Sequence, residues 1–299
     1  MILKHVETFL CVYEECSMTR AAARLNIVQP AVSSQLRKLE AELNVALFDR
    51  SPRGITPTAA GRRLYRLFVP VLDAFRAAER QAHALSAESP VEISVGFNPY
   101  TGSAVLGGVL QAFRLRCPEV DVRIAEEVSP VLVERVASGA LDLAVVNVGG
   151  EGNAYASALV AVPLLEENLV FVEGAIGDAG PSSPIALADV AARRLVLPKS
   201  RHGFRRDLEQ AAAKMNLQLV AELEINAPGP ILDLVASGGI ATVIPEITAR
   251  QAAKHLPLRI RQITSPNVKR LVEYVHRRDR PLSPPLAVLI ELVTVALRP

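Results

Sequence analysis

Polar side chains recur between Gln29 and Lys38 on what the spacing predicts is one side of a helix. Apolar residues at intervals of 4, 3 and 4 form the buried face of that helix, namely Val32, Leu36, Leu39 and Leu43. The outward positions are Gln29, Ser33, Ser34, Arg37 and Lys38. Amides and hydroxyls hydrogen-bond to base edges, and cationic groups neutralise phosphates. This face predicts an interface with double-stranded DNA, although a plain solvated amphipathic helix has the same pattern.

A second polar group follows predicted strands in the C-terminal half. The segments are GFNPYTGS at residues 96–103, LPKSRHGF at 197–204 and EINAPGP at 224–230, and Asn147 ends a further strand. Ligands of open α/β sheets bind beyond the carboxyl ends of strands, where helix N-termini offer free N–H groups. We therefore predict a site for a small anion such as a carboxylate, although each residue alone also fits a turn or capping role. The candidate contacts are Asn98, Tyr100, Thr101, Ser103, Asn147, Ser200, Arg201, His202 and Asn226.

Ser200 and His202 also raise the question of catalysis, because a histidine activates a neighbouring serine in many hydrolases. The sequence contains no G-x-S-x-G elbow, no G-x-x-x-x-G-K phosphate loop and no His or Cys cluster at metal-ligand spacing. We expect no catalytic residue, no metal site and no cofactor.

Charge is unevenly distributed along the 299 residues, although the net charge is only +2. Residues 1–87 contain 12 Lys or Arg and 8 Asp or Glu, and residues 88–299 contain 21 and 23. Between Arg20 and Arg66 there are 9 basic and 3 acidic residues. A local basic excess is typical of a nucleic-acid-binding segment, and alone it also fits an ordinary solvated face.

Three helices and a hairpin are predicted to position the polar face. Apolar residues from Val6 to Tyr13 form the buried stripe of a first helix, and Ser17 is placed to cap a short helix from Met18 to Leu25. Pro30 suits the first turn of the next helix, because its missing N–H has no helical partner there. Together these helices predict a helix-turn-helix. Residues 46–49 and 54–56 predict a β-hairpin wing, whose Arg50 and Arg53 fit the flanking minor groove.

These segments resemble the N-terminal domain of the LysR-type transcriptional regulators. The matching stretches are SMTRAAARLN at residues 17–26, QPAVSSQLRKLEAELNVALFDRS at 29–51 and TPTAAG at 56–61. The form RGITPTAAG resembles the subgroup around the nitrogen assimilation control regulator. Val28 departs from the pattern, because many members have a capping Ser there. The resemblance carries these residues over as DNA contacts: Thr19, Arg20, Gln29, Pro30, Ser33, Ser34, Arg37, Lys38, Arg50 and Arg53.

A heptad pattern in the next segment predicts a pairing helix. Its apolar seam is Leu64, Phe68, Val71, Phe75, Ala78, Ala82 and Leu85, spaced alternately by 4 and 3. Such a seam favours dimerisation over packing on the helix's own domain. Pro70 predicts a kink, and residues 86–90 predict a hinge. The resemblance implies that this helix pairs two protomers and that the protein is a homodimer or homotetramer. It also implies that the protein is an activator with RNA polymerase as a partner.

From residue 91 apolar strands alternate with helices, which predicts parallel α/β units and an α/β fold overall. The resemblance implies a two-lobed effector domain like the periplasmic binding proteins. We divide the chain into a winged helix-turn-helix at 1–58, a linker helix and hinge at 59–90, and an effector domain at 91–299. Lobe I would be 91–162 plus 266–299, and lobe II 163–265.

These observations predict a sequence-specific transcription regulator controlled by a small anion bound between two lobes. The alternative is a constitutive or architectural DNA binder whose C-terminal domain only oligomerises. The sequence predicts no membrane span, because its longest apolar stretch falls well short of about 18 residues. Early charges in the first helix do not fit a secretion signal, so we expect a cytoplasmic protein.

Overall fold

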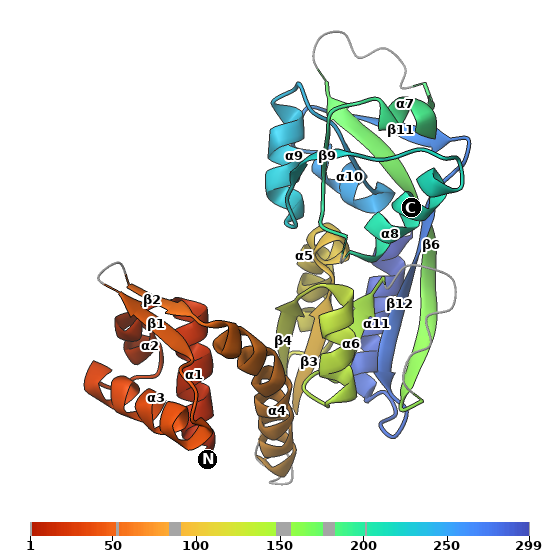
Figure 1. Ribbon diagram of the computed structural model, residues 1–299. Coiled ribbons are helices and arrows are strands. Elements are labelled where there is room, and N and C mark those ends of the chain that lie inside the picture. Colours follow the sequence, from red (N-terminus) through yellow and green to blue (C-terminus); the bar gives the residue numbers. More distant parts are fainter. Residues whose placement is uncertain are drawn as a thin grey trace. The chain divides into compact units, whose positions relative to one another are not determined.

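A computed structural model of the chain describes residues 2–51, 54–83, 91–147, 157–175, 183–200 and 202–298. These residues form two compact units, an N-terminal one that includes α4 and a C-terminal one that begins before β3 (Figure 1). The predicted hinge at 86–90 lies outside the described residues. Within the described ranges, no helix is both long and apolar enough to cross a bilayer.

The N-terminal unit has three helices, a hairpin and a long fourth helix. The elements are α1 (Leu3–Glu15), α2 (Met18–Arg24), α3 (Gln29–Leu43), β1 (Phe48–Ser51), β2 (Gly54–Pro57) and α4 (Ala59–His83). Phe9 of α1 is fully buried at the centre, where its ring contacts those of Tyr13, Phe48 and Phe68. The predicted inward residues Val32, Leu36 and Leu39 of α3 are each 0% exposed. Burial of that stripe leaves the opposite side of α3 for water or a partner.

The helices α2 and α3 begin differently. The Ser17 hydroxyl accepts a hydrogen bond from the Arg20 backbone N–H at 3.3 Å, which is the predicted cap of α2. Val28 occupies the capping position of α3 with extended backbone and no side-chain hydrogen bond, and Pro30 lies in the first turn. Asn44 ends α3 in the left-handed conformation (φ 51°), as its residue type favours.

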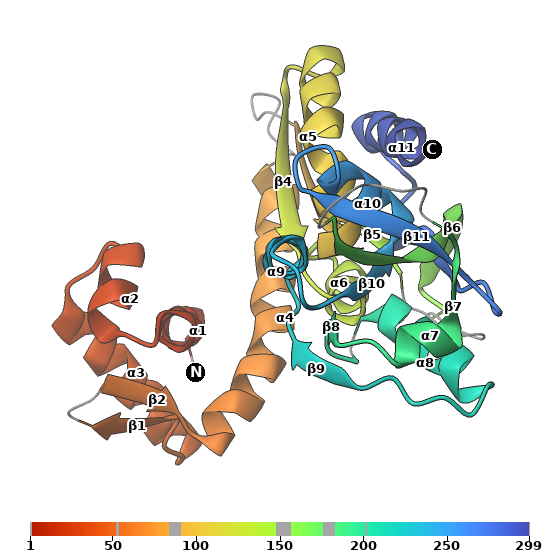
Figure 2. The same cartoon turned by 90° about the horizontal axis from the view of Figure 1, so that it is seen from above.

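The helix α4 is continuous through Pro70, and it bends along its length in both Figure 1 and Figure 2. The predicted seam is wrong in its first two positions. Leu64 and Phe68 pack on the core of the N-terminal unit, together with the 5% exposed Leu72. The exposed apolar strip of α4 consists of Leu67, Val71, Phe75, Ala78 and Ala82. Leu85 lies outside the described residues.

The C-terminal unit alternates strands and helices, as predicted. Its first half contains β3 (Val91–Phe97), α5 (Pro99–Arg116), β4 (Val120–Glu126), α6 (Ser129–Ala137), β5 (Leu143–Val146) and β6 (Leu159–Gly174). The next elements are β7 (Ile185–Ala186), α7 (Leu187–Ala191), β8 (Leu195–Leu197), α8 (Gly203–Ala213), β9 (Ala221–Glu224) and α9 (Pro228–Ala236). The last are β10 (Thr242–Pro245), α10 (Glu246–Ala252), β11 (Leu258–Thr264), β12 (Lys269–Arg277) and α11 (Pro284–Leu297).

The strands are not all parallel, which corrects the expectation of purely parallel units. The strands β4, β3 and β5 are parallel, but β12 pairs antiparallel with both β5 and β6. The strands β10 and β11 also pair antiparallel with β6. A sequence pattern of alternating strands and helices does not distinguish parallel from antiparallel pairing, because a strand's direction depends on how its connection crosses the sheet.

The two largest hydrophobic cores of the C-terminal unit mark its two lobes. One contains Val95, Phe113 and Leu289, and the other contains Phe171, Leu208 and Ile244. The long strand β6 runs through both lobes, since it pairs with β12 up to Asn168 and with β10 from Leu169. Figure 1 shows β6 and β12 side by side along this length. Residues near Asn168 therefore lie where the chain passes from lobe to lobe.

Candidate DNA-binding face and interlobe site

The outward side of α3 is polar and accessible. Gln29, Pro30, Arg37 and Lys38 are exposed, and Ser33 and Ser34 are half-buried. Within the described part of the chain, Arg37 and Lys38 have no ion-pair or hydrogen-bond partner. Two cations without internal partners are available to neutralise phosphates.

The other predicted DNA contacts fall into two groups. Thr19 and Arg20 are exposed on α2, and the Arg20 guanidinium lies 3.3 Å from the Glu15 carboxylate. Arg50 is part of β1, but its side chain and all of Arg53 lie outside what the structure describes. The strands β1 and β2 form the expected antiparallel hairpin, with Ser51 opposite Gly54.

The first turn of α5 brings three predicted ligand residues to the boundary between the lobes. Asn98 caps the helix, since its Oδ1 accepts from the Thr101 N–H at 3.1 Å and its Nδ2 donates to Thr101 Oγ1 at 3.0 Å. Tyr100 belongs to lobe I by sequence, but its ring is 0% exposed within the core of lobe II. Its ring centroid lies 4.7 Å from that of Phe204 and 5.6 Å from that of His202.

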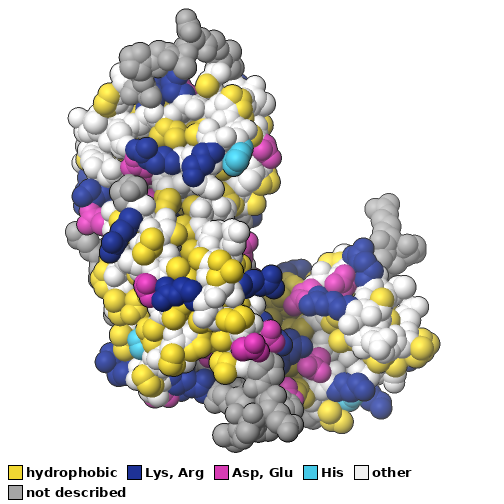
Figure 3. All heavy atoms as spheres, turned by 180° about the vertical axis from the view of Figure 1, so that it is seen from behind, with side chains coloured by type: hydrophobic (Ala, Val, Ile, Leu, Met, Phe, Trp, Pro, Cys, Tyr) yellow, Lys and Arg dark blue, Asp and Glu magenta, His cyan; other side chains and the backbone are white. Residues whose placement is uncertain are grey.

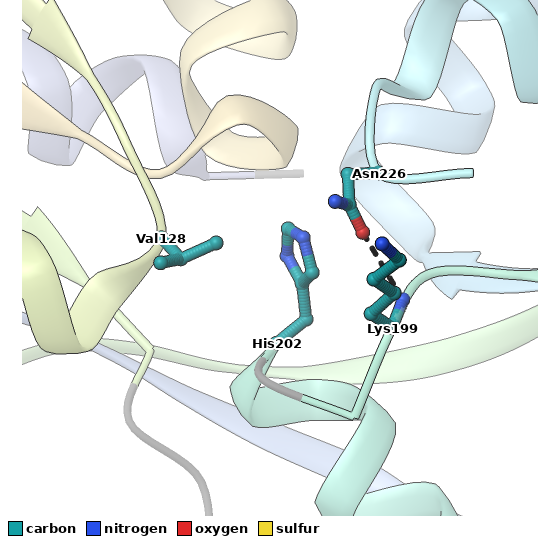
Figure 4. A pocket seen from close by; sticks show the side chains of 4 residues that line it. All are labelled: Val128, Lys199, His202 and Asn226. Atoms are coloured by element: carbon teal, nitrogen blue, oxygen red, sulfur yellow. Dashed lines mark hydrogen bonds between the residues drawn. The ribbon is translucent and has the colours of Figure 1, made fainter. Parts of the chain in front are cut away.

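A pocket of about 440 Å³ adjoins this contact and is lined by Val128, Lys199, His202 and Asn226 (Figure 4). The Lys199 backbone N–H donates to Asn226 Oδ1 at 3.2 Å, which ties two of the predicted turns together. In Figure 4 the His202 ring lies between Val128 on one side and Lys199 with Asn226 on the other. Burial lowers the pKa of His202 below its ordinary 6.5, so the imidazole is neutral at pH 7.

Several buried polar atoms around this pocket have no hydrogen-bond partner among the described residues. They are Tyr100 Oη, Asn147 Oδ1 and His202 Nε2. Burial raises the pKa of the Tyr100 phenol, which stays protonated and able to donate. Because an unpartnered buried polar atom is costly, these groups favour a polar ligand or a different lobe arrangement.

Asn147 and Gly203 hold the two lobes in close contact. The Asn147 backbone N–H donates to Ser129 Oγ at 3.0 Å, and Asn147 Nδ2 donates to the Leu271 carbonyl at 2.9 Å. A Cβ atom on Gly203 would lie 2.2 Å from the Asn147 carbonyl oxygen. Only glycine allows the start of α8 to approach this closely.

The remaining predicted ligand residues lie apart from the pocket lining. Ser103 is exposed and its hydroxyl donates to the Tyr100 carbonyl at 3.1 Å. Ser200 is exposed, and Arg201 lies outside the described residues. Within the described ranges, no group of three or more His, Cys, Asp or Glu residues is arranged to hold a metal ion.

A buried ion pair beside Thr101 was not predicted from the sequence. Arg270 of β12 lies opposite Glu167 of β6, and its Nε donates to Glu167 Oε1 at 2.8 Å. Arg270 Nη2 also donates to Thr101 Oγ1 at 3.2 Å. The signal available in the sequence was a charged residue in each of two strands, but ordinary exposed strand positions look the same.

The charges of the C-terminal unit are mixed on the face seen in Figure 3, where basic and acidic side chains are interspersed. No broad field of one sign forms on that face. This agrees with the near balance of 21 basic and 23 acidic residues in 88–299. Arg37 and Lys38 of α3, which have no partner in the described part of the chain, are therefore the stronger candidates for DNA contact.

Comparison with known proteins decides the family. Residues 3–62 match the family described as bacterial regulatory helix-turn-helix protein, lysR family, and residues 87–298 match the LysR substrate binding domain. The chain belongs to the LysR family. It is a DNA-binding transcription regulator with an effector-binding domain, which confirms the predicted winged helix-turn-helix and two-lobed α/β fold.

Relatives of this LysR-family chain include two nitrogen assimilation regulatory proteins, nac. The chain is 32% identical to that of Klebsiella aerogenes over 251 residues (84% of this chain, 80% of the relative), and 30% identical to that of Escherichia coli K12 over 269 residues (90% and 86%). The predicted resemblance to this subgroup is confirmed at that level of identity. A probable cat1 operon transcriptional activator of Acinetobacter lwoffii is 28% identical over 256 residues (84% and 82%).

Solved LysR-family structures share the fold. CbnR matches with a TM-score of 0.69 at 20% identity, over 100% of both chains. Full-length CbnR in complex with its target DNA matches with a TM-score of 0.66 at 22% identity, over 99% of this chain and 100% of that chain.

Proposed function

We propose that this LysR-family regulator recognises bases through the outward face of α3 and responds to a small carboxylate bound between its lobes. The observation that supports the effector site is the pocket at His202, beside which buried polar atoms of both lobes have no hydrogen-bond partner among the described residues. Lys199 supplies a cation, and Tyr100 and His202 supply donors for carboxylate oxygens. Effector binding would then change how the two lobes are held and, through α4, how the DNA-binding domains are presented.

For DNA binding we retain the roles predicted above. Gln29, Ser33 and Ser34 would contact base edges, and Arg37 and Lys38 would contact phosphates. Thr19, Arg20, Pro30, Arg50 and Arg53 remain proposed flanking contacts. The division at residues 58 and 90 into DNA-binding, linker and effector segments is part of the same proposal.

We further propose that two copies pair through the exposed strip of α4. Val71 is 56% exposed and Phe75 is 43% exposed, and such large apolar side chains in a row on one helix favour a partner helix. Paired recognition helices would bind an interrupted inverted repeat. Because the protein would act on the chromosome, we place it in the cytoplasm. It would be an activator that contacts RNA polymerase and would catalyse no reaction of its own.

The second candidate is a constitutive regulator whose C-terminal domain only assembles the oligomer. The observation that favours it is Tyr100, whose ring fills the space between Phe204 and His202 and already joins the lobes. In this case no metabolite would alter DNA binding.

Replacing Lys199 with alanine is expected to weaken binding of the effector carboxylate by about 10- to 100-fold, because a hydrogen bond to a charged group contributes roughly 1.5–3 kcal/mol. A panel of small carboxylates is first screened by thermal unfolding of the intact protein, and any stabiliser is titrated by calorimetry with and without DNA. Lys214→Ala, an exposed lysine at the end of α8, is the matched control. If no carboxylate of the panel stabilises the protein, the constitutive regulator is favoured. Equal loss of carboxylate affinity in both variants would contradict the proposed site.

A further inference from the structure

The ion pair between Arg270 and Glu167 is enclosed by protein. The Arg270 side chain is 0% exposed and that of Glu167 is 6% exposed. Three donors converge on this one carboxylate: Arg270 Nε at 2.8 Å, Arg270 Nη2 at 2.5 Å and the Ile247 backbone N–H at 3.1 Å. Such convergence of charge-assisted donors is how proteins bind free carboxylates.

The donors come from both lobes. Arg270 lies on β12, the strand that returns to lobe I, and Ile247 lies on α10, which directly follows β10 of lobe II. Arg270 Nη2 donates to Thr101 of α5, and Thr248 of α10 donates from Oγ1 to the Tyr100 carbonyl at 2.9 Å. The Glu167 carboxylate therefore bridges the same elements whose separation would open the lobes.

Energetics argue against a purely stabilising role. Removing two charges from water is costly, and well-packed apolar residues of similar size give equal or greater stability. Arg270 Nη1 also remains buried without a partner among the described residues. The pair is thus better suited to fixing one arrangement of the lobes than to maximising stability.

We propose that the surroundings of Arg270 form a carboxylate-binding site that the chain fills with its own Glu167, so that this internal ligand holds the two lobes together. The site is distinct from the pocket at His202, and the inference does not depend on the proposed effector. Removal of the Glu167 side chain leaves a space beside Arg270 that a free formate or acetate ion fits.

The test uses the intact protein and its Glu167→Ala variant. Loss of one partner of a buried ion pair is expected to lower Tm by about 10 °C. Formate or acetate at tens of millimolar should restore most of this loss, compared with chloride at the same ionic strength. Exchange of the Ile247 amide proton should accelerate in the variant and slow again in formate, which reports whether the ion occupies the carboxylate position.

Three controls make the outcome decisive. Glu166→Ala removes the neighbouring carboxylate of an exposed pair with Lys269 and should not respond to formate. Glu167→Gln keeps the volume filled and should be destabilised without rescue. The double variant Glu167→Leu/Arg270→Met removes both charges and should be folded and insensitive to formate.

If Glu167→Ala does not accumulate as folded protein, its recovery from denaturant is measured instead, and more folded protein in formate than in chloride is the expected result. Absence of rescue in Glu167→Ala, by Tm or by recovery, would overturn the proposal. Stabilisation of wild type and Glu166→Ala by formate to the same extent as Glu167→Ala would overturn it as well.

Discussion

Replacing Phe75 with glutamate is expected to convert the protein from a dimer to a monomer and to weaken operator binding by about 100-fold or more. Phe75 is 43% exposed in the middle of the apolar strip of α4. A carboxylate there would be buried without a partner against the second helix, at a cost that a two-helix seam does not offset. Light scattering and sedimentation measure the mass, and titration with an operator duplex measures the affinity.

The matched control is Arg66→Glu, which introduces the same carboxylate at an exposed polar position of α4 outside the strip. This variant should remain dimeric. A Phe75→Glu protein with the same mass as wild type would contradict pairing through this face of α4.

Replacing Gly203 with alanine is expected to destabilise the interlobe contact and abolish any effector response. The new methyl carbon would lie 2.2 Å from the Asn147 carbonyl oxygen and 2.7 Å from its Oδ1. Because the first of these is a backbone atom, the lobes must separate, at a cost of about 1–3 kcal/mol or more. This exceeds the roughly 0.5–1 kcal/mol by which alanine favours a helix over glycine. Thermal unfolding and amide exchange at α8 measure the effect.

Gly229→Ala is the control for this change, because Gly229 also lies in the first turn of a helix of lobe II. Among the described residues, no atom beyond its own stretch of helix lies within 4 Å of the added carbon. Its stability should equal or exceed that of wild type. Equal behaviour of the two alanine variants would show that close approach at Gly203 does not constrain the lobes.

The recognition helix was predictable from sequence because its signals are local. The spacing of Val32, Leu36 and Leu39 assigns the buried face, and Pro30 marks the first turn. The α4 seam was predicted less well, because heptad spacing is also a local signal and does not reveal that Leu64 and Phe68 pack on their own domain. Which apolar stripe of a long helix stays exposed is decided by tertiary contacts.

The interlobe site was predictable only in part. Strand-to-helix turns predicted His202 and Asn226 as ligand contacts, since helix starts gather at one edge of a sheet, and both residues line the pocket of Figure 4. Contact with a ligand stays a prediction. Arg270 and Glu167 are 103 residues apart, and only the antiparallel register of β12 with β6 places them opposite one another. That register follows from the order of strands in the sheet, which alternating apolar segments do not specify.

The most direct test of base recognition by paired α3 helices is selection of bound duplexes from a random library by the intact protein, repeated with Gln29→Ala and Lys38→Ala. Wild type should enrich two half-sites in an interrupted inverted repeat, and Gln29→Ala should change the preferred base at symmetric positions in both. Lys38→Ala should keep the sequence, bind all duplexes more weakly and reduce the salt slope by about 1. Enrichment of an unpaired site, or identical base preferences in wild type and Gln29→Ala, would contradict the account.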